Sequence, residues 1–403
     1  MVEWRPAQLG DLLREPTRNG IHKGKAWQGR GVPLIKMGEV YSSSYVGDDN
    51  RDLLDLSPAE LDRLSVHDDD LLFCRTSLVA EGVGRCALVR GLTAPAAFAS
   101  NLIRVRVDDR KADPRFIFWV FRSSVGRALC HSIARGTSVT TITGPDLARL
   151  EIALPPLPEQ RAIAEVLGAL DDKIESNRNQ ILSSDHLYLS ICEEALSHRS
   201  TCQPTRLGDV AEVSLGGTPS RKNPDFWMEG TIPWVNSGCL HERPLITPAD
   251  WITDEGLARS STKLIEPGAV LVAITGATLG VVSRLGIRAA INQSVVAISC
   301  PEAPPLEGFL YYWIRSRVER LVSSATGGAQ QHINKGNVED FPVEVPDDDA
   351  LVRIGAALPL LDRQVALTRQ NQILESLRDT LLPELLAGRI RVSEAREHVE
   401  DSP

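Results

Sequence analysis

The sequence predicts an α+β protein in which two mixed α/β modules are each followed by a long helical segment. Motifs recur in the same order in both halves of the chain, strand-like runs fill each module, and a heptad spacing of apolar residues follows the first module. A chain of 403 residues exceeds the roughly 100–200 residues of a single domain. Its 42% hydrophobic and 24% charged residues are typical of globular proteins.

An internal repeat runs along nearly the whole chain. Leu9-Gly10-Asp11 recurs as Leu207-Gly208-Asp209, and the aromatic segment 116–123 recurs at 309–316. From Gly136 onward the offset between the halves is constant at 191 residues, as from Ile142 to Ile333. Matches in the same order over such a length indicate duplication of one structural unit.

Each module combines strands with one aromatic helix. The helix is expected at 114–124 in the first module and at 306–320 in the second. Alternating apolar residues at 150–154 and 341–345 predict a half-buried strand at each module end. Further β-rich runs bounded by Gly, Pro and Asn predict strands at 71–74, 102–107, 270–274 and 295–299.

The two helical segments are expected to pack as an antiparallel coiled coil, which would relate the halves by a pseudo-twofold axis. In the first segment, apolar or small residues recur in alternating steps of four and three, the spacing of a coiled-coil seam. Asn177 and Ser184 lie in this seam, where polar side chains weaken packing but fix the register. The second segment carries a less regular stripe from Ile354 to Leu385.

Residues that break or cap helices predict where the segments bend and end. Gly168 and Pro359 share one repeat position, so a bend is expected there, with Asp171 and Asp362 capping the longer helix. Pro383 is expected to kink the last helix or to start a final turn, and Gly388 to cap the helix. The expected divisions are modules at 1–155 and 201–346, helical segments at 156–200 and 347–391, and a frayed acidic tail at 392–403.

The helical segments have a length that matters if the chain binds DNA. A helix of about 25 residues is about 37 Å long, and one turn of B-DNA is about 34–36 Å. Paired helices could therefore hold the two modules one DNA turn apart. Helical dimerisation or packing without any ruler function is the alternative.

Charge is distributed unevenly along the chain. The formal net charge of −9 argues against nucleic acid at first sight, because phosphate contacts need Lys and Arg. Residues 1–155 carry 21 basic and 19 acidic side chains, whereas the helical segments 156–200 and 347–403 carry 4 against 8 and 7 against 11. Residues 201–346 carry 12 against 15. This pattern permits a basic face on each module.

Several classes of protein are disfavoured. The longest apolar run, 270–282, is interrupted by Thr and Gly and is shorter than the ~20 residues of a membrane helix. The N-terminus lacks the basic start and apolar stretch of a secretory signal, so a cytoplasmic location is expected. The seven cysteines are far apart, without zinc-ligand spacing, and are expected to be reduced core thiols.

No catalytic, cofactor or metal constellation is evident, so the chain is not expected to be an enzyme. The run Gly216-Gly217-Thr218-Pro219-Ser220-Arg221-Lys222 lacks the spacing of a phosphate-binding loop. Asn223-Pro224-Asp225-Phe226 departs from the Asn-Pro-Pro-Tyr/Phe loop of amino methyltransferases, and no glycine-rich cofactor loop precedes it. The histidines are scattered, with no His-Glu-x-x-His motif.

The chain resembles the specificity subunits of type I restriction-modification systems over about residues 5 to 391. The run 154–163 (LPPLPEQRAI) with 170–174 (LDDKI) carries the resemblance most specifically. Gly-Thr-Pro-Ser at 217–220 with 230–235, and the run 381–388 (LLPELLAG), add to it. The second helical segment lacks the Pro-x-x-Glu-Gln opening, and the first module lacks a clean Gly-Thr-Pro-Ser.

The resemblance implies a non-catalytic DNA-binding protein in which each module is a target-recognition domain for one half of a bipartite, asymmetric site. The paired helices would set the unread spacer and dock methyltransferase subunits, two of them in this family. Restriction and translocase subunits would join the larger complex. S-adenosylmethionine would belong to those partners, so no cofactor is expected in this chain.

Polar loop residues at repeated positions are the candidate DNA contacts, because Arg and Gln can make bidentate contacts to guanine and adenine. For each of these residues, a structural role in a turn or at the start of a helix explains the sequence equally well. They are Arg75, Thr76, Arg135, Thr137 and Ser138 in the first module, and Thr218, Ser220, Arg221, Lys222, Thr275, Gln330, Gln331, His332 and Lys335 in the second.

Two other function classes stay open on the sequence. A fused nuclease or methyltransferase would need catalytic motifs that these residues do not supply. A protein-only adaptor would use the coiled coil alone for binding. Activity of the isolated chain with DNA, Mg²⁺ and S-adenosylmethionine tests the first, and DNA binding with and without a methyltransferase partner tests the second.

Overall fold

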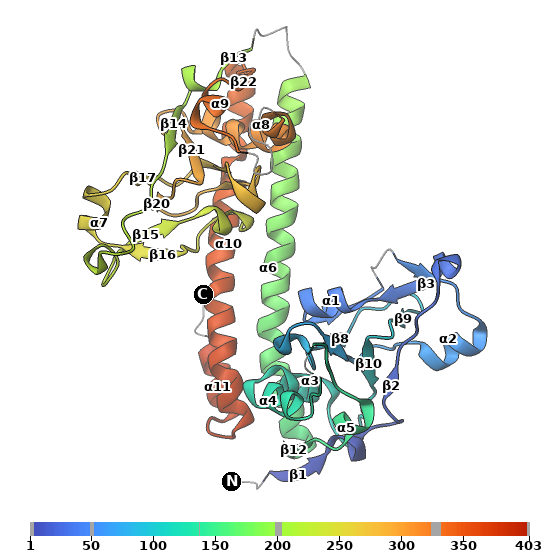
Figure 1. Cartoon of the computed structure of the whole chain (residues 1–403). Coiled ribbons are helices and arrows are strands. Elements are labelled where there is room, and N and C mark those ends of the chain that lie inside the picture. The colour runs from blue at the N-terminus through green and yellow to red at the C-terminus, as the bar shows by residue number, and fades with distance from the viewer. Residues whose placement is uncertain (1–3, 49–51, 137, 198–203, 324–331, 401–403) are drawn as a thin grey trace. The chain divides into compact units, whose positions relative to one another are not determined.

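The structure is a computed structural model that describes residues 4–48, 52–136, 138–197, 204–323 and 332–400. The chain divides into two compact units. Unit 1 comprises Met1–Lys173 with Leu374–Pro403, and unit 2 comprises Ile174–Ile373. Each unit therefore holds one module together with parts of both long helices, as the labels of Figure 1 allow the reader to follow.

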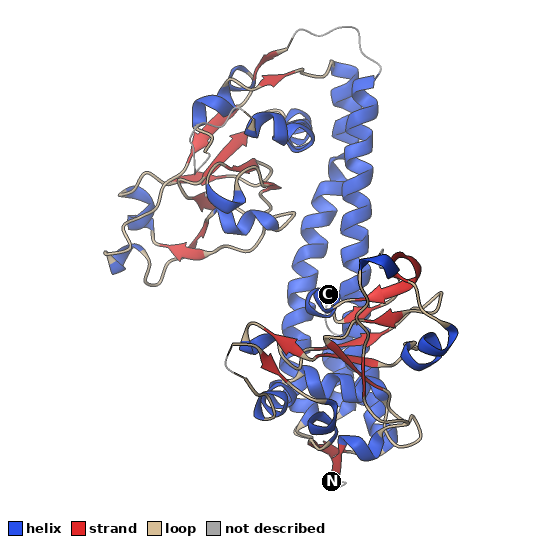
Figure 2. Ribbon diagram, turned by 45° about the vertical axis from the view of Figure 1, so that its right-hand side comes forward, coloured by secondary structure: helices blue, strands red, loops and turns tan. Residues whose placement is uncertain are grey.

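The module of unit 1 contains two main sheets and two smaller strand pairs (Figure 2). The first sheet has the order β2 (Arg18–Asn19), β10 (Leu102–Val105), β6 (Leu71–Cys74), β8 (Cys86–Val89) and β4 (Tyr45–Val46). The second has the order β5 (Leu53–Leu54), β3 (Gln28–Ile35) and β9 (Ala97–Phe98). The pairs are β1 (Arg5–Gln8) with β12 (Glu151–Leu154), and β7 (Thr76–Ser77) with β11 (Thr140–Thr141).

The module of unit 2 repeats this plan. Its first sheet has the order β14 (Glu212–Leu215), β21 (Val295–Ser299), β18 (Val270–Ala273) and β19 (Val282–Arg284). Its second has the order β16 (Asp250–Ile252), β15 (Ile232–Val235), β20 (Ala289–Ile291) and β17 (Lys263–Ile265). β13 (Thr205–Arg206) pairs with β22 (Pro342–Val343) at the module ends.

The two modules share the same pairings in the same order, which confirms the internal repeat. β6 pairs antiparallel with β10 and β8, as β18 does with β21 and β19. β3 pairs parallel with β9, as β15 does with β20. A short 3-10 helix carries the repeated Leu-Gly-Asp in each module, at Leu9–Leu12 and Leu207–Asp209.

The expected aromatic helices are α3 (Pro114–Arg122) and α8 (Pro304–Val322). The Asp113 side chain accepts hydrogen bonds from the backbone N–H groups of Arg115 and Phe116, and Pro114 occupies the first turn, so α3 begins where the sequence supplies its cap. Ser123 ends α3 and caps α4 (Ser124–Ser132), because its hydroxyl accepts from the Gly126 N–H. The remaining short helices are α1 (Met37–Ser42), α2 (Pro58–Leu64), α5 (Gly144–Ala148), α7 (Asp254–Ala258) and α9 (Lys335–Glu339).

The long helices are α6 (Leu157–Ser197) and α10 (Asp348–Leu386), which run antiparallel (Figure 1). In unit 2, Asn177 of α6 contacts Asn371 of α10, and Gln180 further along α6 contacts Arg363. In unit 1, Arg378 of α10 contacts Asp171 of α6. The paired helices confirm the expected coiled-coil packing.

The expected helix caps within these segments are wrong. Gly168 and Pro359 lie inside α6 and α10, and Asp171 and Asp362 are interior residues and not caps. With 41 residues, α6 is about 60 Å long at 1.5 Å per residue, not the expected 37 Å. Tertiary packing outweighs local propensity here, because a continuous helix buries its apolar stripe along its whole length.

The C-terminal region also differs from expectation. Pro383 stands at the start of the last turn of α10, and Gly388 follows the helix with φ 64°, the left-handed conformation of a C-cap. The expected frayed tail contains α11 (Val392–Glu400). α11 packs within unit 1, where Ala395 is buried and Arg396 donates to Glu165 of α6 at 2.7 Å.

Candidate nucleic-acid interface

The structure brings two of the predicted clusters of the first module together. β7 and β11 pair antiparallel, with Thr76 opposite Thr141. The backbone of Arg135 exchanges hydrogen bonds with Thr141 at 2.8 and 2.9 Å, and the Ile142 N–H donates to the Arg75 carbonyl at 2.9 Å. Arg75, Thr76 and Arg135 therefore belong to one surface site, although the sequence separates them by about 60 residues.

Both arginines of this site are exposed in part and held in place. The Arg75 guanidinium donates to the Ser100 carbonyl at 3.3 Å. Arg135 forms an ion pair with Asp146 at 3.3 Å. Ser138 is exposed on the turn before β11, and Thr137 lies outside the described residues. A duplex bound here would meet pre-positioned donors, which lowers the entropy cost of binding.

The second module repeats this pairing with different residues. Thr275 forms an antiparallel bridge with His332, and the Ile333 N–H donates to the Ile274 carbonyl at 3.0 Å. His332 follows Thr141 by the repeat offset of 191 residues, so the two pairs are equivalent. Lys335 begins α9 and forms an ion pair with Glu339 at 3.2 Å. Gln330 and Gln331 lie outside the described residues.

The glycine-rich run of the second module reaches the same site through residues that sequence reasoning missed. The Thr218 hydroxyl donates to Gln293, and the neighbouring Ser294 carbonyl accepts from the Ile274 N–H at 3.0 Å. Gln293 is exposed between the Thr218 and Thr275 positions. The signal in the sequence is the polar turn Asn292-Gln293-Ser294 between two apolar strands, a pattern that only the sheet pairing connects to the site.

Arg221 is exposed but engaged. Its guanidinium donates to Asp250 and lies over the Trp227 ring, 3.3 Å from the centroid. This hydrogen bond holds the pKa of the Asp250 carboxyl below its ordinary value. Ser220 and Lys222 beside Arg221 are exposed. Arg221 is thus a positioned donor whose charge is partly offset before any ligand arrives.

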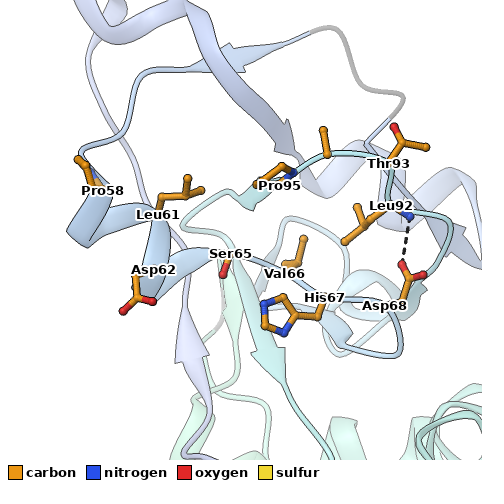
Figure 3. A pocket seen from close by; sticks show the side chains of 11 residues that line it. Pro58, Leu61, Asp62, Ser65, Val66, His67, Asp68, Leu92, Thr93 and Pro95 are labelled. Atoms are coloured by element: carbon orange, nitrogen blue, oxygen red, sulfur yellow. Dashed lines mark hydrogen bonds between the residues drawn. The ribbon is translucent and has the colours of Figure 1, made fainter.

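An open depression of about 690 Å³ lies on the first module between α2 and the loops at 65–68 and 92–95. Figure 3 shows its side chains, with the Asp68 carboxylate accepting from the Leu92 N–H at 3.1 Å. Its charged residues are Asp62 and Asp68, with His67 beside them. Carboxylates repel the phosphates of nucleic acid, so this depression is a poor candidate for the duplex.

The described residues were also compared with the requirements of a metal site, a membrane span and a reactive thiol. No group of three or more His, Cys, Asp or Glu side chains is arranged to hold a metal ion within those residues. None of their helices is long and apolar enough to cross a membrane. Cys74, Cys86, Cys130 and Cys192 are buried free thiols, and burial raises the pKa of each to about 12. Cys239 and Cys300 are free and half-buried, and Cys202 lies outside the described residues.

The family model described as "Type I restriction modification DNA specificity domain" matches residues 1–183 and 199–377. The chain belongs to this family. The two matched segments correspond to the two repeats, and the chain is therefore built from two DNA specificity domains.

Individual proteins similar to this chain are also named specificity subunits. The chain is 30% identical over 176 residues to the EcoR124I/EcoR124II specificity subunit of Escherichia coli, a match that spans 42% of each chain. It is 21% identical over 416 residues to the putative MjaX specificity subunit of Methanocaldococcus jannaschii, spanning 97% of this chain and 94% of that protein. A crystal structure of an S subunit from M. genitalium shares the fold, with a TM-score of 0.62, 16% identity and coverage of 95% and 96%.

Proposed function

We propose that this DNA specificity protein reads a bipartite, asymmetric DNA site, with one half-site for each module. The observation that carries the proposal is the equivalent polar pairing in both modules, Thr76 with Thr141 and Thr275 with His332. Each pairing is surrounded by donors that can contact base edges or phosphates. Divergent residues at equivalent positions make the two half-sites different.

The candidate contacts that belong to this proposal are the fourteen named from the sequence, with Gln293 added. We assign recognition of one half-site to 1–155 and of the other to 201–346. The helical segments 156–200 and 347–391 would fix the unread spacer and dock two methyltransferase subunits, with restriction and translocase subunits joining them. Since its ligand would be the chromosome, the chain would act in the cytoplasm and contribute recognition without catalysis.

The half-site assignment is tested by DNA footprinting with the purified complex. Arg221→Ala and Gln330→Ala should each weaken binding at the second half-site by ~1–3 kcal/mol per lost base contact. Contacts to the first half-site should persist in both variants. Unchanged affinity would remove these residues from the interface.

The spacer assignment is tested by lengthening both helices together. Insertion of one heptad after Lys173 in α6 and one after Ile373 in α10 extends each by about 10 Å at the boundary between the units. The tolerated spacer should then grow by about three base pairs, since B-DNA rises ~3.4 Å per pair. A heptad inserted near Ser184 in α6 alone should also alter it. An unchanged spacer would refute the ruler.

The competing functions have their own readouts. Mapping methylated adenines in the host genome gives the target directly if the chain selects DNA for a methyltransferase. Cleavage or methylation by the isolated chain with Mg²⁺ and S-adenosylmethionine would favour an enzyme. A chain that binds the methyltransferase but never shifts DNA, alone or in complex, would be an adaptor.

A further inference from the structure

An exposed apolar tip lies beside the arginines of the first module. Leu78 and Val79 directly follow β7 and are 83% and 55% exposed. Val139, 46% exposed, directly precedes β11, whose first residue Thr140 pairs with Ser77, the residue before Leu78. We call Leu78, Val79 and Val139 the apolar tip. Single exposed apolar residues are ordinary on proteins, but three at the end of one strand pair suggest a surface that binds a ligand.

The backbone behind the tip is fixed. The Ser77 hydroxyl accepts from the Val79 N–H at 3.1 Å and hydrogen-bonds the Tyr41 hydroxyl at 2.7 Å. The Gly82 N–H donates to the Val79 carbonyl at 3.0 Å, and Arg127 of α4 donates to the Glu81 carbonyl at 2.6 Å. The tip is therefore held out toward solvent by a network of hydrogen bonds and is organised before any ligand binds.

The surroundings of the tip are basic in a chain whose net charge is −9. Residues 75–85 and 122–149, which pair through β7 and β11, contain six arginines and two carboxylates. Asp146 is one of those carboxylates, and it already pairs with Arg135 and Arg149. We call Arg75, Arg85, Arg127 and Arg135 the arginine rim. An apolar centre with a cationic border matches a DNA groove, in which bases lie between two lines of phosphates.

The second module differs at the same positions. The repeat register aligns Leu78 and Val79 with Ala277 and Thr278, and Val139 with Gln330. Apolar side chains of one module thus correspond to small or polar side chains of the other. Such a difference at equivalent positions is what two unlike half-sites require.

We propose that Leu78 is a specificity-determining residue of the first module, which makes an apolar contact with a base of its half-site while the arginine rim binds the flanking phosphates. The inference rests on the proposed function and names the chemistry of one half of it. Two kinds of base contact share this chemistry. Leucine can cover the methyl group of thymine, or it can insert between base pairs and unstack them.

The test selects preferred sequences from a randomised duplex pool with the full chain, alone and in complex with its methyltransferase subunits. Leu78→Ser should lose base preference at one or two adjoining pairs of one half-site, with affinity for the original sequence reduced about tenfold, as burial of a leucine side chain implies. The other half-site should keep its preference. Leu78→Met should retain the wild-type preference. Val125→Ser is the matched control, since Val125 is 65% exposed on α4 and belongs neither to the apolar tip nor to the arginine rim.

Two substitutions in the DNA distinguish the kinds of contact. Uracil in place of thymine should reduce wild-type affinity about fourfold and leave Leu78→Ser unaffected if leucine covers the methyl group. Fluorescence of 2-aminopurine beside the affected pair should rise with wild type alone if leucine unstacks the bases. Either result supports the contact.

The inference and the proposed function fail in different ways. A wild-type chain that selects no sequence, alone or in complex, refutes the proposed function. A wild-type chain that selects a sequence, together with a Leu78→Ser variant of the same preference and affinity, refutes this inference alone. Superimposable unfolding curves for both proteins, expected because Leu78 is exposed, show that the variant is folded.

Discussion

In both units an aspartate, a tyrosine and an arginine attach the module to the long helices, but the three side chains are arranged differently. In unit 1, Asp171 of α6 accepts from the Tyr45 hydroxyl at 3.1 Å and pairs with Arg378 of α10 at 2.6 Å. In unit 2, Asp185 of α6 pairs with Arg315 at 2.6 Å and accepts from Tyr311, both from α8. One carboxylate joins three elements in unit 1, whereas its counterpart in unit 2 joins two.

The buried contact between the long helices in unit 2 is made by uncharged amide groups. The Asn177 amide donates to Asn371 at 2.9 Å and to Gln370 at 2.8 Å, and the Asn371 amide donates to the Ile174 carbonyl. Asp171 and Asp185 are not related by the repeat, because the repeat partner of Asp171 is Asp362. The repeat therefore extends to the fold, whereas the buried polar contacts that fix each module on its helix lie at different repeat positions in the two units.

Burial keeps these clusters in defined protonation states. In unit 1, desolvation first and the Asp171 carboxylate second raise the pKa of Tyr45 far above its ordinary value. Desolvation likewise raises the pKa of Tyr311 in unit 2. Both phenols therefore stay protonated at neutral pH, where each can donate a hydrogen bond to its carboxylate.

The largest effect is expected from Asp171→Ala in unit 1. The substitution removes the buried carboxylate that Arg378 and Tyr45 share and leaves Arg378, 15% exposed, with only the exposed Asp379 as an ion-pair partner. It should cost about 3 kcal/mol of unfolding free energy, the lower end of the range for a broken buried pair. Asp362→Ala is the control at the equivalent repeat position, where the carboxylate is 73% exposed and 3.6 Å from Arg284. It should cost at most about 1 kcal/mol. Urea unfolding measures both, and equal costs would show that the buried cluster is not what stabilises unit 1.

A smaller loss is expected from Asp185→Ala in unit 2. Arg315 keeps its hydrogen bond to Tyr311, and its side chain is more exposed to solvent than that of Arg378. The expected cost in unfolding free energy is therefore about 2–3 kcal/mol. Asp172→Ala serves as the control because its pair with Arg90 is exposed on both sides. Hydrogen exchange should show greater opening of α8 in the Asp185 variant. Protection that stays at the wild-type level would argue against Asp185 as the attachment of that module.

Asn177→Ala tests the uncharged contact between the helices. It should cost about 1–2 kcal/mol, because the Asn371 carbonyl oxygen is left buried without its donor. The double variant with Asn371→Ala should be less destabilised than the sum of the two single variants, since both partners are then gone. Additive losses in the double-mutant cycle would mean that the two amides are not coupled.

The smallest effect is a gain from Gly168→Ala in α6. A Cβ at Gly168 meets nothing within 4 Å, so the alanine should add about 0.5–1 kcal/mol through helix propensity alone. Gly355→Ala in α10 is the comparison, because its Cβ would lie 3.2 Å from Pro305. Its gain should be smaller or absent. A thermal shift of equal size in both variants would contradict this difference.

The sequence determined the duplication, the longer core strands such as β6, β10, β18 and β21, and the heptad seam of α6. These features are local. Apolar residues recur every second residue in a half-buried strand and every three or four residues in an amphipathic helix, because of the geometry of each element. Asn177 was correctly placed in the seam of α6. Its partner Asn371 lies in α10, whose apolar stripe is less regular in the sequence. The candidate contacts were identified one by one, but their grouping was not, because strand pairing between distant segments decides it.

Only the tertiary structure decided how far each helix continues and what its polar residues do. Gly168 and Pro359 are poor helix formers, yet α6 and α10 continue through them because packing along the whole stripe outweighs a cost of about 1–3 kcal/mol. Asp171 predicts a cap from its neighbours, but a carboxylate 5% exposed takes its role from Arg378 and Tyr45. A local pattern fixes which face of an element is apolar, whereas partners that are distant in the chain fix the role of a buried charge.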